Sequence, residues 1–329
     1  MRKFLIVRFS SIGDIVLTSP VIRCLKQQVP GCEVHFLTRD PYKIVLEHHP
    51  LIDRLWSTSG DLEDVLPGLK QEGFEAVIDL HHNLRSLKLK RALGVPSHSF
   101  RKLNIEKWML VNLKVNRLPD LHIVDRYLET VRSLDVTNDN KGLDYYSGPG
   151  SEPVLNRLPE SHQQGYLAIA IGAQHSTKIL PSDKTTRIIQ MLGKPVVLLG
   201  GKEDHKRGVQ LSMAAPETTW NACGQFSLGE SAEIIRHASV VLTHDTGLMH
   251  IASAFRKPIV SVWGNTVPAF GMWPYLPGEQ EKSIIIEAKD LACRPCSKIG
   301  FEKCPKSHFN CMRELSEKEI VEAILRLWG

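Results

Sequence analysis

Two loops of this sequence place small, polar and charged side chains directly after a run of apolar residues. Residues 10–14 (SSIGD) follow the apolar run Phe4–Phe9, and residues 245–247 (DTG) follow Val240–Thr243. A loop that joins a buried strand to a helix leaves backbone N–H groups available at the helix start, where they bind anions or sugars. Both loops are therefore candidate binding sites, and each also carries a carboxylate.

Asp14 is the only ionisable side chain in the first loop. A carboxylate that faces a cleft can serve as a general base, which takes a proton from a hydroxyl nucleophile. The alternative is structural, because many aspartates placed just before a helix cap its N-terminus. The spacing alone leaves both interpretations open.

The second loop, Asp245-Thr246-Gly247, offers backbone N–H donors and a hydroxyl to a pyrophosphate at a helix N-terminus. Gly247 has no side chain, so a ligand can approach the backbone closely. Asp245 can accept hydrogen bonds from sugar hydroxyls. The same pattern is typical of a capped helix start with nothing bound.

Two more strand ends in the second half of the chain carry candidate residues. Lys178 follows an apolar run and can neutralise a diphosphate leaving group, although a lone lysine is usually a surface residue. Gly200-Gly201 precede Glu203 and Asp204, and an acid near a strand end can hold ribose hydroxyls. The chain has no G-x-x-x-x-G-K-[ST] and no G-x-G-x-x-G, which argues against a P-loop protein and a Rossmann dehydrogenase. It also has no Asp-x-Asp, so the commonest short metal–diphosphate motif of sugar transferases is missing.

Four cysteines near the end of the chain are spaced C-x₂-C-x₇-C-x₆-C, with His308 among them. They are Cys293, Cys296, Cys304 and Cys311. Four cysteines within a short segment are compatible with a structural zinc site, but the second pair lacks the usual C-x₂-C spacing. We therefore predict no cofactor, with reduced thiols in an ordered loop, and keep structural zinc as the alternative.

The net charge of +5 is unevenly distributed. Residues 85–117 hold nine Lys and Arg and one acid, Glu106, so this segment carries +8 and the remainder −3. Such a block suggests an anionic partner, which can be nucleic acid, a membrane surface or a phosphorylated substrate, or else a solvated helix face. RNA binding is disfavoured, because Phe100 and Trp108 are the only aromatic residues in the block.

A repeated order of strand, loop and helix positions these residues. Strand-like runs lie at 4–9, 33–38, 76–80, 167–171, 195–199, 240–243 and 258–263, and helical runs at 15–28, 182–192, 203–215, 229–237, 247–255 and 317–327. This α/β alternation predicts two Rossmann-like domains with parallel sheets and a cleft between them, in which ligands bind at the carboxyl ends of the strands.

The domain boundaries follow from a stretch rich in Gly, Pro, Ser and Asn at residues 137–164. We expect a first Rossmann-like domain at 1–150, a second at 151–312, and a final helix at 313–329 that packs back toward the first domain. With 329 residues, 42% of them hydrophobic and 23% charged, the chain suits a globular protein and excludes disorder and collagen. We find no secretory signal or membrane span and expect a cytoplasmic protein.

Several longer motifs stand in one order along nearly the whole chain. They are FLIVRFSSIGDIVLTSP (4–20), IDLHHNLRS (78–86), HIVDRYLE (122–129), LLGGKED (198–204), LTHDTGLMHIASAF (242–255), and WGNTVP with GMWPY (263–275). Together they resemble the ADP-heptose:lipopolysaccharide heptosyltransferases, glycosyltransferase family nine. The tail, CRPCSKIGFEKCPKSHFNCM (293–312), resembles that of the second heptosyltransferase of the inner core.

This resemblance implies a GT-B architecture and an inverting, metal-independent transfer of heptose from ADP-heptose to a hydroxyl of the lipopolysaccharide inner core. Asp14 matches the family's catalytic aspartate, and Lys178 matches the lysine that contacts the donor phosphates. The implied donor-binding residues are Thr177, Glu203, Asp204, Asp245, Thr246 and Gly247. The implied acceptor-binding residues are Ser10, Ser11, Gly13, Arg85, Lys88, Arg91, His122 and Arg126.

The implied partners are the nucleotide sugar and a lipid-linked acceptor, met at the inner face of the inner membrane, with no nucleic acid. The sequence departs from the family at Leu180-Pro181, where Trp-Pro is frequent, and at Thr177, where an acid is common. These departures leave the donor sugar open. The alternatives are a GT-B transferase that uses another nucleotide sugar for a surface glycan, and a non-catalytic protein that binds nucleotide or nucleic acid.

Overall fold

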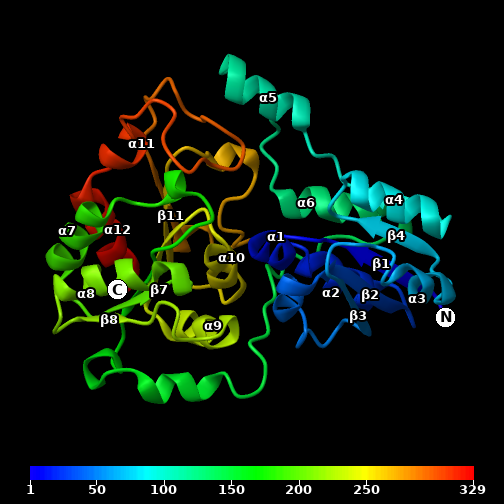
Figure 1. The fold of residues 1–329 in the computed structure, drawn as a ribbon, viewed down its shortest axis with the longest axis horizontal. Coiled ribbons are helices and arrows are strands. Elements are labelled where there is room, and N and C mark those ends of the chain that lie inside the picture. The colour runs from blue at the N-terminus through cyan, green and yellow to red at the C-terminus, as the bar shows by residue number, and fades with distance from the viewer. The chain divides into compact units, whose positions relative to one another are not determined.

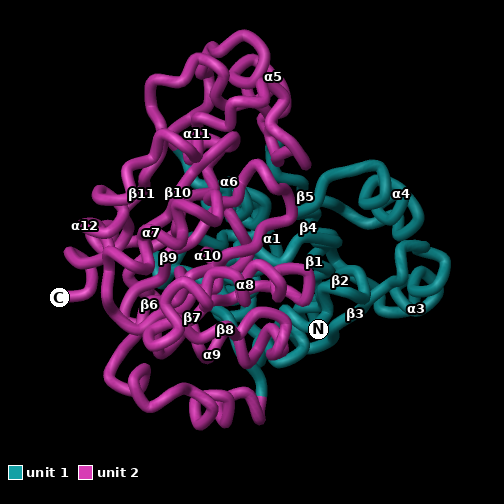
Figure 2. Tube along the Cα trace, turned by 60° about the vertical axis from the view of Figure 1, so that its left-hand side comes forward, with its two compact units in different colours: residues 1–102, 121–148 teal, residues 103–120, 149–329 magenta.

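The computed structural model describes residues 1–329, which divide into two compact units (Figures 1 and 2). The first unit comprises residues 1–102 and 121–148, and the second comprises residues 103–120 and 149–329. The change at residue 149 falls within the stretch that the sequence indicates as a linker. Residues 103–120, in contrast, belong to the second unit although their neighbours on both sides belong to the first. None of the helices has the length and apolar character needed to span a membrane.

The first unit is built on a five-stranded parallel sheet with the order β3-β2-β1-β4-β5. Its strands are β1 (Lys3–Val7), β2 (Glu33–Arg39), β3 (Arg54–Thr58), β4 (Ala76–Asp79) and β5 (Ser97–Ser99). Its helices are α1 (Ile12–Val16), α2 (Ser19–Gln28), α3 (Leu66–Gln71), α4 (Leu84–Leu93) and α6 (Ile123–Leu128). β1 and β4 are apolar and almost entirely buried, as expected for central strands of a parallel sheet covered on both faces.

The second unit is built on a six-stranded parallel sheet with the order β11-β10-β9-β6-β7-β8. Its strands are β6 (Leu167–Ala170), β7 (Val196–Leu199), β8 (Thr219–Asn221), β9 (Val240–His244), β10 (Ile259–Trp263) and β11 (Ser283–Glu287). Its helices are α5 (Asn104–Leu113), α7 (Ser182–Leu192), α8 (His205–Met213), α9 (Leu228–His237), α10 (Gly247–Ala254), α11 (Asn310–Arg313) and α12 (Glu317–Trp328).

Both sheets have the strand order of a doubly wound Rossmann fold, so the α/β prediction is confirmed. In each sheet the first strand of the unit lies beside the fourth, and the chain winds outward from this point in both directions. The neighbouring pairs are β1 with β4 in the first unit and β6 with β9 in the second. Ligands of such sheets bind at the carboxyl ends of the strands at this topological switch point.

The helical run expected at 15–28 is two helices, α1 and α2, and the break between them positions Asp14. Thr18 precedes α2, and Pro20, which has no N–H to donate, stands at its start. The Thr18 hydroxyl donates a 2.6 Å hydrogen bond to the carbonyl of Ile15 and so satisfies an acceptor at the end of α1. The short helix α1 therefore forms its own turn at the end of β1, and Asp14 is its third residue.

The final helix, α12, packs within the second unit. Its residues Ile320 and Ile324 are fully buried in the core that also contains Leu167 and Leu242 of the central strands. Lys184 of α7 donates a hydrogen bond to the carbonyl of Leu315. The apolar stripe that suggested packing toward the first domain is thus buried in the second unit.

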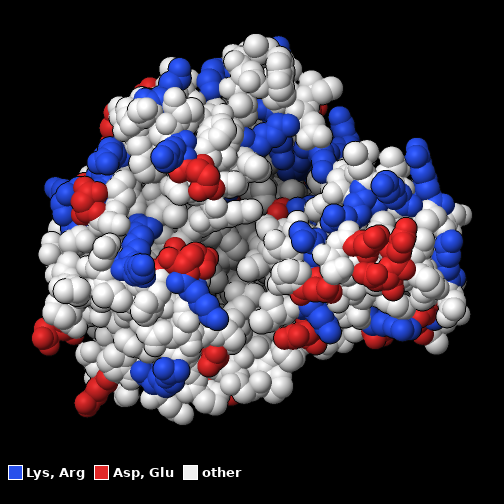
Figure 3. Space-filling model, in the orientation of Figure 1, with Lys and Arg blue, Asp and Glu red and all other residues white.

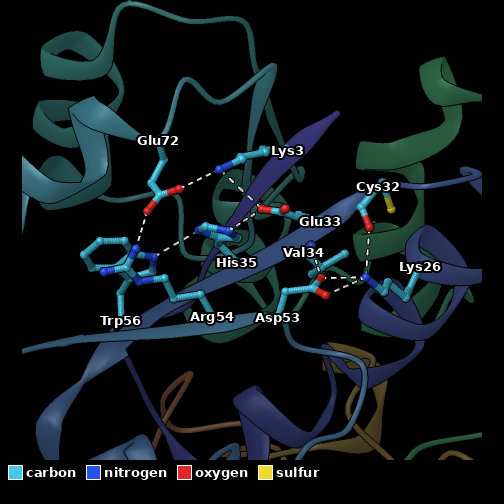
Figure 4. A network of polar contacts seen from close by, with 10 residues as sticks. All are labelled: Lys3, Lys26, Cys32, Glu33, Val34, His35, Asp53, Arg54, Trp56 and Glu72. Carbon is cyan, nitrogen blue, oxygen red and sulfur yellow. Dashed lines mark hydrogen bonds and ion pairs between the residues drawn. The ribbon is translucent and has the colours of Figure 1, made fainter. Parts of the chain in front are cut away.

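Polar contacts join the opposite, amino-terminal ends of strands β1, β2 and β3 (Figure 4). Lys3 Nζ lies 2.8 Å from Glu72 and 3.3 Å from Glu33, and Arg54 also pairs with Glu72. Trp56 Nε1 donates a 3.2 Å hydrogen bond to Nδ1 of His35 in this network. Because these pairs are partly exposed, each contributes only about 1 kcal/mol or less to stability. The polar side chains at this end of the sheet therefore contribute to stability, and the candidate site residues lie at the carboxyl ends of the strands.

Candidate active site

Asp14 lies at the carboxyl end of β1, where its carboxylate accepts hydrogen bonds and pairs with a cation. Oδ2 accepts from the Ser11 backbone N–H at 3.3 Å and from the Ser11 hydroxyl at 2.8 Å. Oδ1 lies 2.7 Å from Nη2 of Arg8. The Asp14 side chain is 20% exposed, so solvent and a substrate can reach it. Asp14 therefore fits both the structural and the general-base interpretation. It forms a capping box with Ser11, and it still presents its carboxylate at the strand end.

Arg8 is a site residue that the sequence analysis did not single out. Its guanidinium donates to the carbonyls of Ser10 and Leu80, each at 2.6 Å, and to the Tyr127 hydroxyl at 3.0 Å. Burial lowers the pKa of Arg8, but Asp14, Tyr127 and Asp79 together outweigh this effect, and the net pKa lies above its usual value. A charged residue at the end of the apolar run FLIVRF is the signal that could have identified it.

The loop after β4, the other strand of the switch point, contributes His81, and the start of α4 contributes Arg85. His81 packs edge-on against Phe9, with ring centroids 5.2 Å apart, and the guanidinium of Arg85 lies 5.4 Å from the centre of the same ring. Burial, together with the positive charges of Arg8 and Lys102, lowers the pKa of His81 to about 4. His81 is therefore neutral at physiological pH and lies in the same electrostatic environment as Asp14.

The buried Asp79 at the end of β4 holds this loop in place. Its carboxylate accepts from the backbone N–H groups of His81 and His82 and from the Ser86 hydroxyl, and it pairs with Lys90 at 2.8 Å. Burial raises the pKa of Asp79, but these partners, Lys90 foremost, lower it more, so the net pKa is below its usual value. Lys90 therefore has a structural role within the basic block.

The remaining basic residues of α4 differ in exposure. Arg85, Lys88 and Arg91 recur every third residue and so lie near one face of the helix, with Lys88 and Arg91 exposed. This face can meet acceptor anions, as the sequence predicts for all three residues.

Two of the predicted acceptor residues are instead buried around α6. His122 is 3% exposed, and its Nδ1 accepts a hydrogen bond from the Val124 N–H at the start of the helix. Arg126 is 5% exposed, and its Nη1 donates to the carbonyl of Arg101 at 3.4 Å. The structure thus buries both side chains in the capping and packing of α6, and their role as acceptor ligands stays a prediction.

The second unit brings Lys178 and Asp245 together, from the loops after β6 and β9. Lys178 Nζ lies 2.6 Å from Asp245 Oδ2, and the same oxygen accepts a 3.0 Å hydrogen bond from the Thr266 hydroxyl. The Lys178 and Asp245 side chains are 15% and 13% exposed, so the pair is accessible but shielded. Two residues that the sequence places 67 positions apart therefore meet at the switch point of this sheet. Thr266, from the loop after β10, was not singled out, although it lies in the motif WGNTVP, which is the signal that could have identified it.

Helix α10 begins next to this pair and leaves its first N–H groups uncapped by a side chain. Thr246 is the N-cap residue, but its side chain makes no capping hydrogen bond, and Gly247 is the first helical residue. Burial, Arg207 and Lys178 lower the pKa of His244 to about 3, so this fully buried ring is neutral. The available donors and the positive end of the helix dipole form a site suited to an anion.

Glu203 and Asp204 differ in their surroundings. Asp204 Oδ2 accepts a 2.9 Å hydrogen bond from the Gly201 N–H. A methyl group added to Gly172, at the end of β6, would lie 2.0 Å from the same carboxylate oxygen. Burial raises the pKa of Asp204. Glu203 is exposed, so Asp204 is the acid that lies at the strand ends.

Thr177, expected to bind the donor, is bound to the cysteine-containing segment instead. Its hydroxyl donates to the carbonyl of Phe301 at 2.9 Å and accepts from the N–H of the same residue at 2.8 Å. The side chain is 3% exposed, so it anchors the loop that carries Lys178. A neighbouring pocket of about 430 Å³ is lined by Ser176, Thr177, Glu302, Lys303, Cys304, Ser307 and Phe309, and it does not include Lys178 or Asp245.

The four terminal cysteines are free thiols whose loop is fixed by Arg294. The buried Arg294 guanidinium donates to the carbonyls of Gly264, Trp263 and Thr266 at the end of β10. Cys293 Sγ lies 3.9 Å from His308 Nε2, but no three His, Cys, Asp or Glu side chains are grouped so that they could hold a metal ion. Structural zinc at these cysteines stays the untested alternative. Arg294 itself anchors the segment to the loop that supplies Thr266.

Comparison with known proteins agrees with this geometry. The sequence profile of glycosyltransferase family 9 (heptosyltransferase) matches residues 65–303. The lipopolysaccharide heptosyltransferase 1 of Campylobacter coli is 24% identical over 289 residues, which cover 80% of this chain and 84% of the relative. The solved E. coli ADP-heptose lps heptosyltransferase II superimposes with a TM-score of 0.75 at 18% identity, covering 100% of this chain and 98% of that one. E. coli heptosyltransferase WaaC, solved with ADP-2-deoxy-2-fluoro heptose, gives a TM-score of 0.68 at 19% identity and coverages of 98% and 99%.

Proposed function

Because this chain belongs to glycosyltransferase family 9 and has the GT-B fold of the heptosyltransferases, we propose that it is an inverting enzyme that transfers a heptose without a metal ion. The donor is ADP-heptose, and the acceptor is a hydroxyl of the lipopolysaccharide inner core. One observation carries the proposal: Asp14 and the pair Lys178–Asp245 each lie at the carboxyl ends of the strands that form a switch point.

The second unit binds the nucleotide sugar. The diphosphate lies at the start of α10, where it accepts hydrogen bonds from the backbone N–H groups around Thr246 and Gly247. Asp204, at the ends of β6 and β7, holds the ribose hydroxyls. A relative of the same fold was solved with an ADP-heptose analogue, which supports this class of donor.

Lys178 and the start of α10 stabilise the leaving group. As the bond between the anomeric carbon and the diphosphate breaks, negative charge grows on the departing phosphate oxygens. The Lys178 ammonium, held by Asp245 and indirectly by Thr266, meets this charge. A preorganised donor of this kind contributes about 3 kcal/mol to stabilisation of the transition state. These fixed charges perform the function that a divalent cation performs in metal-dependent transferases.

Asp14 is the general base. The acceptor hydroxyl attacks the anomeric carbon from the face opposite the diphosphate, and its proton passes to the Asp14 carboxylate. A single displacement inverts the configuration of the anomeric carbon. Proton transfer to a positioned base contributes roughly 10²–10⁴-fold to the rate. Ser11 and Arg8 act as positioning residues, because they fix the two oxygens of this carboxylate.

The first unit binds the lipid-linked acceptor at the inner face of the inner membrane. Arg85 lies beside the ring of Phe9, while Lys88 and Arg91 extend the positive charge along the exposed face of α4. Phosphates and carboxylates of the inner core provide the complementary anions. Together these three side chains orient the acceptor toward Asp14.

The test is a donor competition combined with a transfer assay. The purified chain is incubated with a defined inner-core acceptor and ADP-heptose, another ADP-sugar or a UDP-sugar, and ADP or UDP release is followed with and without EDTA. We expect turnover with ADP-heptose, inversion at the anomeric carbon in the product, and no loss of activity in EDTA. Preferential turnover of a UDP-sugar would replace the proposed donor. Activity that disappears in EDTA and returns with Mg²⁺ would overturn metal independence.

A further inference from the structure

Helix α5 exposes its apolar side chains, whereas a surface helix normally buries them. Ile105, Trp108 and Leu113 are 73%, 51% and 54% exposed. Ile105 and Trp108 are three residues apart and lie on one face. Leu113, eight residues after Ile105, lies about 80° around the helix from it. The only buried residue of the helix is Leu110. An exposed apolar cluster of this kind marks an interaction surface.

Three lysines fix the orientation of this helix within the second unit. Lys107 Nζ lies 5.9 Å from the centre of the Phe270 ring. Lys114 Nζ donates to the carbonyls of Cys293 and Pro295, at 3.1 and 2.8 Å. Lys298 Nζ reaches the carbonyl of Asn104 at 3.5 Å. The exposed face therefore points outward on a defined support, rather than belonging to a loosely attached segment.

The loop that supports α5 extends the surface. Ile299 is 64% exposed and directly follows Lys298, which contacts the first residue of α5. We refer to Ile105, Trp108, Leu113 and Ile299 as the α5 face. In the space-filling view, white atoms cover much of the projecting end of α5 at the top (Figure 3).

The charges around the α5 face are mainly positive. Lys114, Arg117 and Lys298 are exposed beside it. The one acid within α5, Glu106, is only partly exposed. The helix itself thus has no fully exposed carboxylate that would repel an anionic surface. Apolar side chains that include a tryptophan, surrounded by cations, are the composition of segments that lie in a membrane interface.

We propose that the α5 face docks on an anionic lipid bilayer, with its apolar side chains in the headgroup region and Arg117 and Lys298 against the lipid phosphates. The helix has 10 residues, so it lies on the bilayer and does not cross it. The inference rests on the proposed function in one respect, because a lipid-linked acceptor requires the enzyme to work at a membrane surface. A neutral partner or a second copy of the chain would gain nothing from the surrounding cations.

The test measures co-sedimentation of the full chain with vesicles of phosphatidylethanolamine and phosphatidylglycerol, and with vesicles of phosphatidylcholine alone, without donor or acceptor. We expect binding to the anionic vesicles that weakens as salt rises. The double variant I105S/W108S should lose about tenfold or more of this affinity. The matched control is M191S/M213S, because Met191 and Met213 are 52% and 74% exposed elsewhere in the second unit. The control should bind like the parent chain.

The charge variant R117E/K298E keeps the apolar residues and should also lose most binding to anionic vesicles, with little change toward phosphatidylcholine. Unchanged vesicle binding by I105S/W108S would overturn the proposal. Concentration-dependent dimerisation that this variant abolishes, with no vesicle binding by the parent, would assign the face to a second copy. Transfer to a lipid-free inner-core acceptor should be the same for parent and variants, so this assay reports separately on the proposed function.

Discussion

Replacement of Asp14 by asparagine tests the central residue of the proposed mechanism. The amide retains an oxygen that can accept from Ser11, but it has neither the charge that pairs with Arg8 nor the basicity to take a proton. We expect kcat to fall roughly 10²–10⁴-fold, which corresponds to about 3–5 kcal/mol of activation free energy. Donor affinity should not change, because the donor contacts lie at Lys178, Asp245 and α10.

The same substitution has a stability cost that the structure allows us to bound. Removing one partner of a fully buried ion pair costs about 3–5 kcal/mol. Here the Arg8 and Asp14 side chains are 10% and 20% exposed, and Arg8 keeps its bonds to Ser10, Leu80 and Tyr127, so we expect a loss of about 2 kcal/mol. Such a loss leaves the protein folded at assay temperature, which urea unfolding will verify.

The assay pairs single-turnover transfer with calorimetric titration of a non-hydrolysable ADP-sugar. Ser11→Ala serves as a graded control, because it removes one 2.8 Å hydrogen bond to Asp14 and leaves the carboxylate, and it should lower kcat only about fivefold. Transfer by the Asp14→Asn variant within threefold of the parent rate would refute the assignment of the base. Equal losses in both variants would show that the loop conformation, rather than the carboxylate, limits the rate.

Three further predictions concern charge. Lys178→Met should lower kcat about 10²-fold or more in the same transfer assay, because no other side chain identified here neutralises the leaving diphosphate; an unchanged kcat would contradict its role. Arg23→Ala leaves the carboxylates of Asp139 and Asp144 without their shared guanidinium, whose side chain is 6% exposed, and should reduce the free energy of unfolding in urea by about 3 kcal/mol. The folded protein holds the pKa of His244 at about 3, below its usual 6.5, so the unfolded chain takes up this proton first and stability should fall as pH decreases from 6.5 toward 3. His244→Gln should flatten that pH dependence, and an identical slope would count against the assignment.

Periodicity predicted the central strands and most helices, because burial on both faces leaves a clear apolar pattern. β9 has the sequence VVLTH and is buried at every position, and α7 begins and ends at the residues that the pattern indicated. The edge strands escaped prediction. β5 and β8 have three residues each, and β3 begins at the exposed Arg54, so their hydrogen bonds to neighbouring strands define them more than their composition does.

The sequence predicted a site residue only where that residue lies in a loop after a recognisable strand. Asp14, Lys178 and Asp245 stand at strand ends that the sequence marks clearly. Arg8 and Thr266 contribute through contacts with residues far away in the sequence or on another loop, and local pattern does not show such contacts. At Thr177, His122 and Arg126 the family resemblance implies a ligand, whereas the structure shows a buried side chain with hydrogen bonds inside its own unit, and the sequence does not show such burial.

The chain passes between the two units at residues 102–103, 120–121 and 148–149. Neither unit can therefore be cut out as one continuous fragment. A fragment that starts at residue 149 would lack α5, and the carbonyls of Cys293 and Pro295 would lose Lys114. A reorientation of one unit during turnover must therefore change the backbone at all three of these crossings together. This requirement restricts the motion more than a single hinge would. Isolated halves for biophysical work are better obtained by carrying residues 103–120 along on an engineered linker.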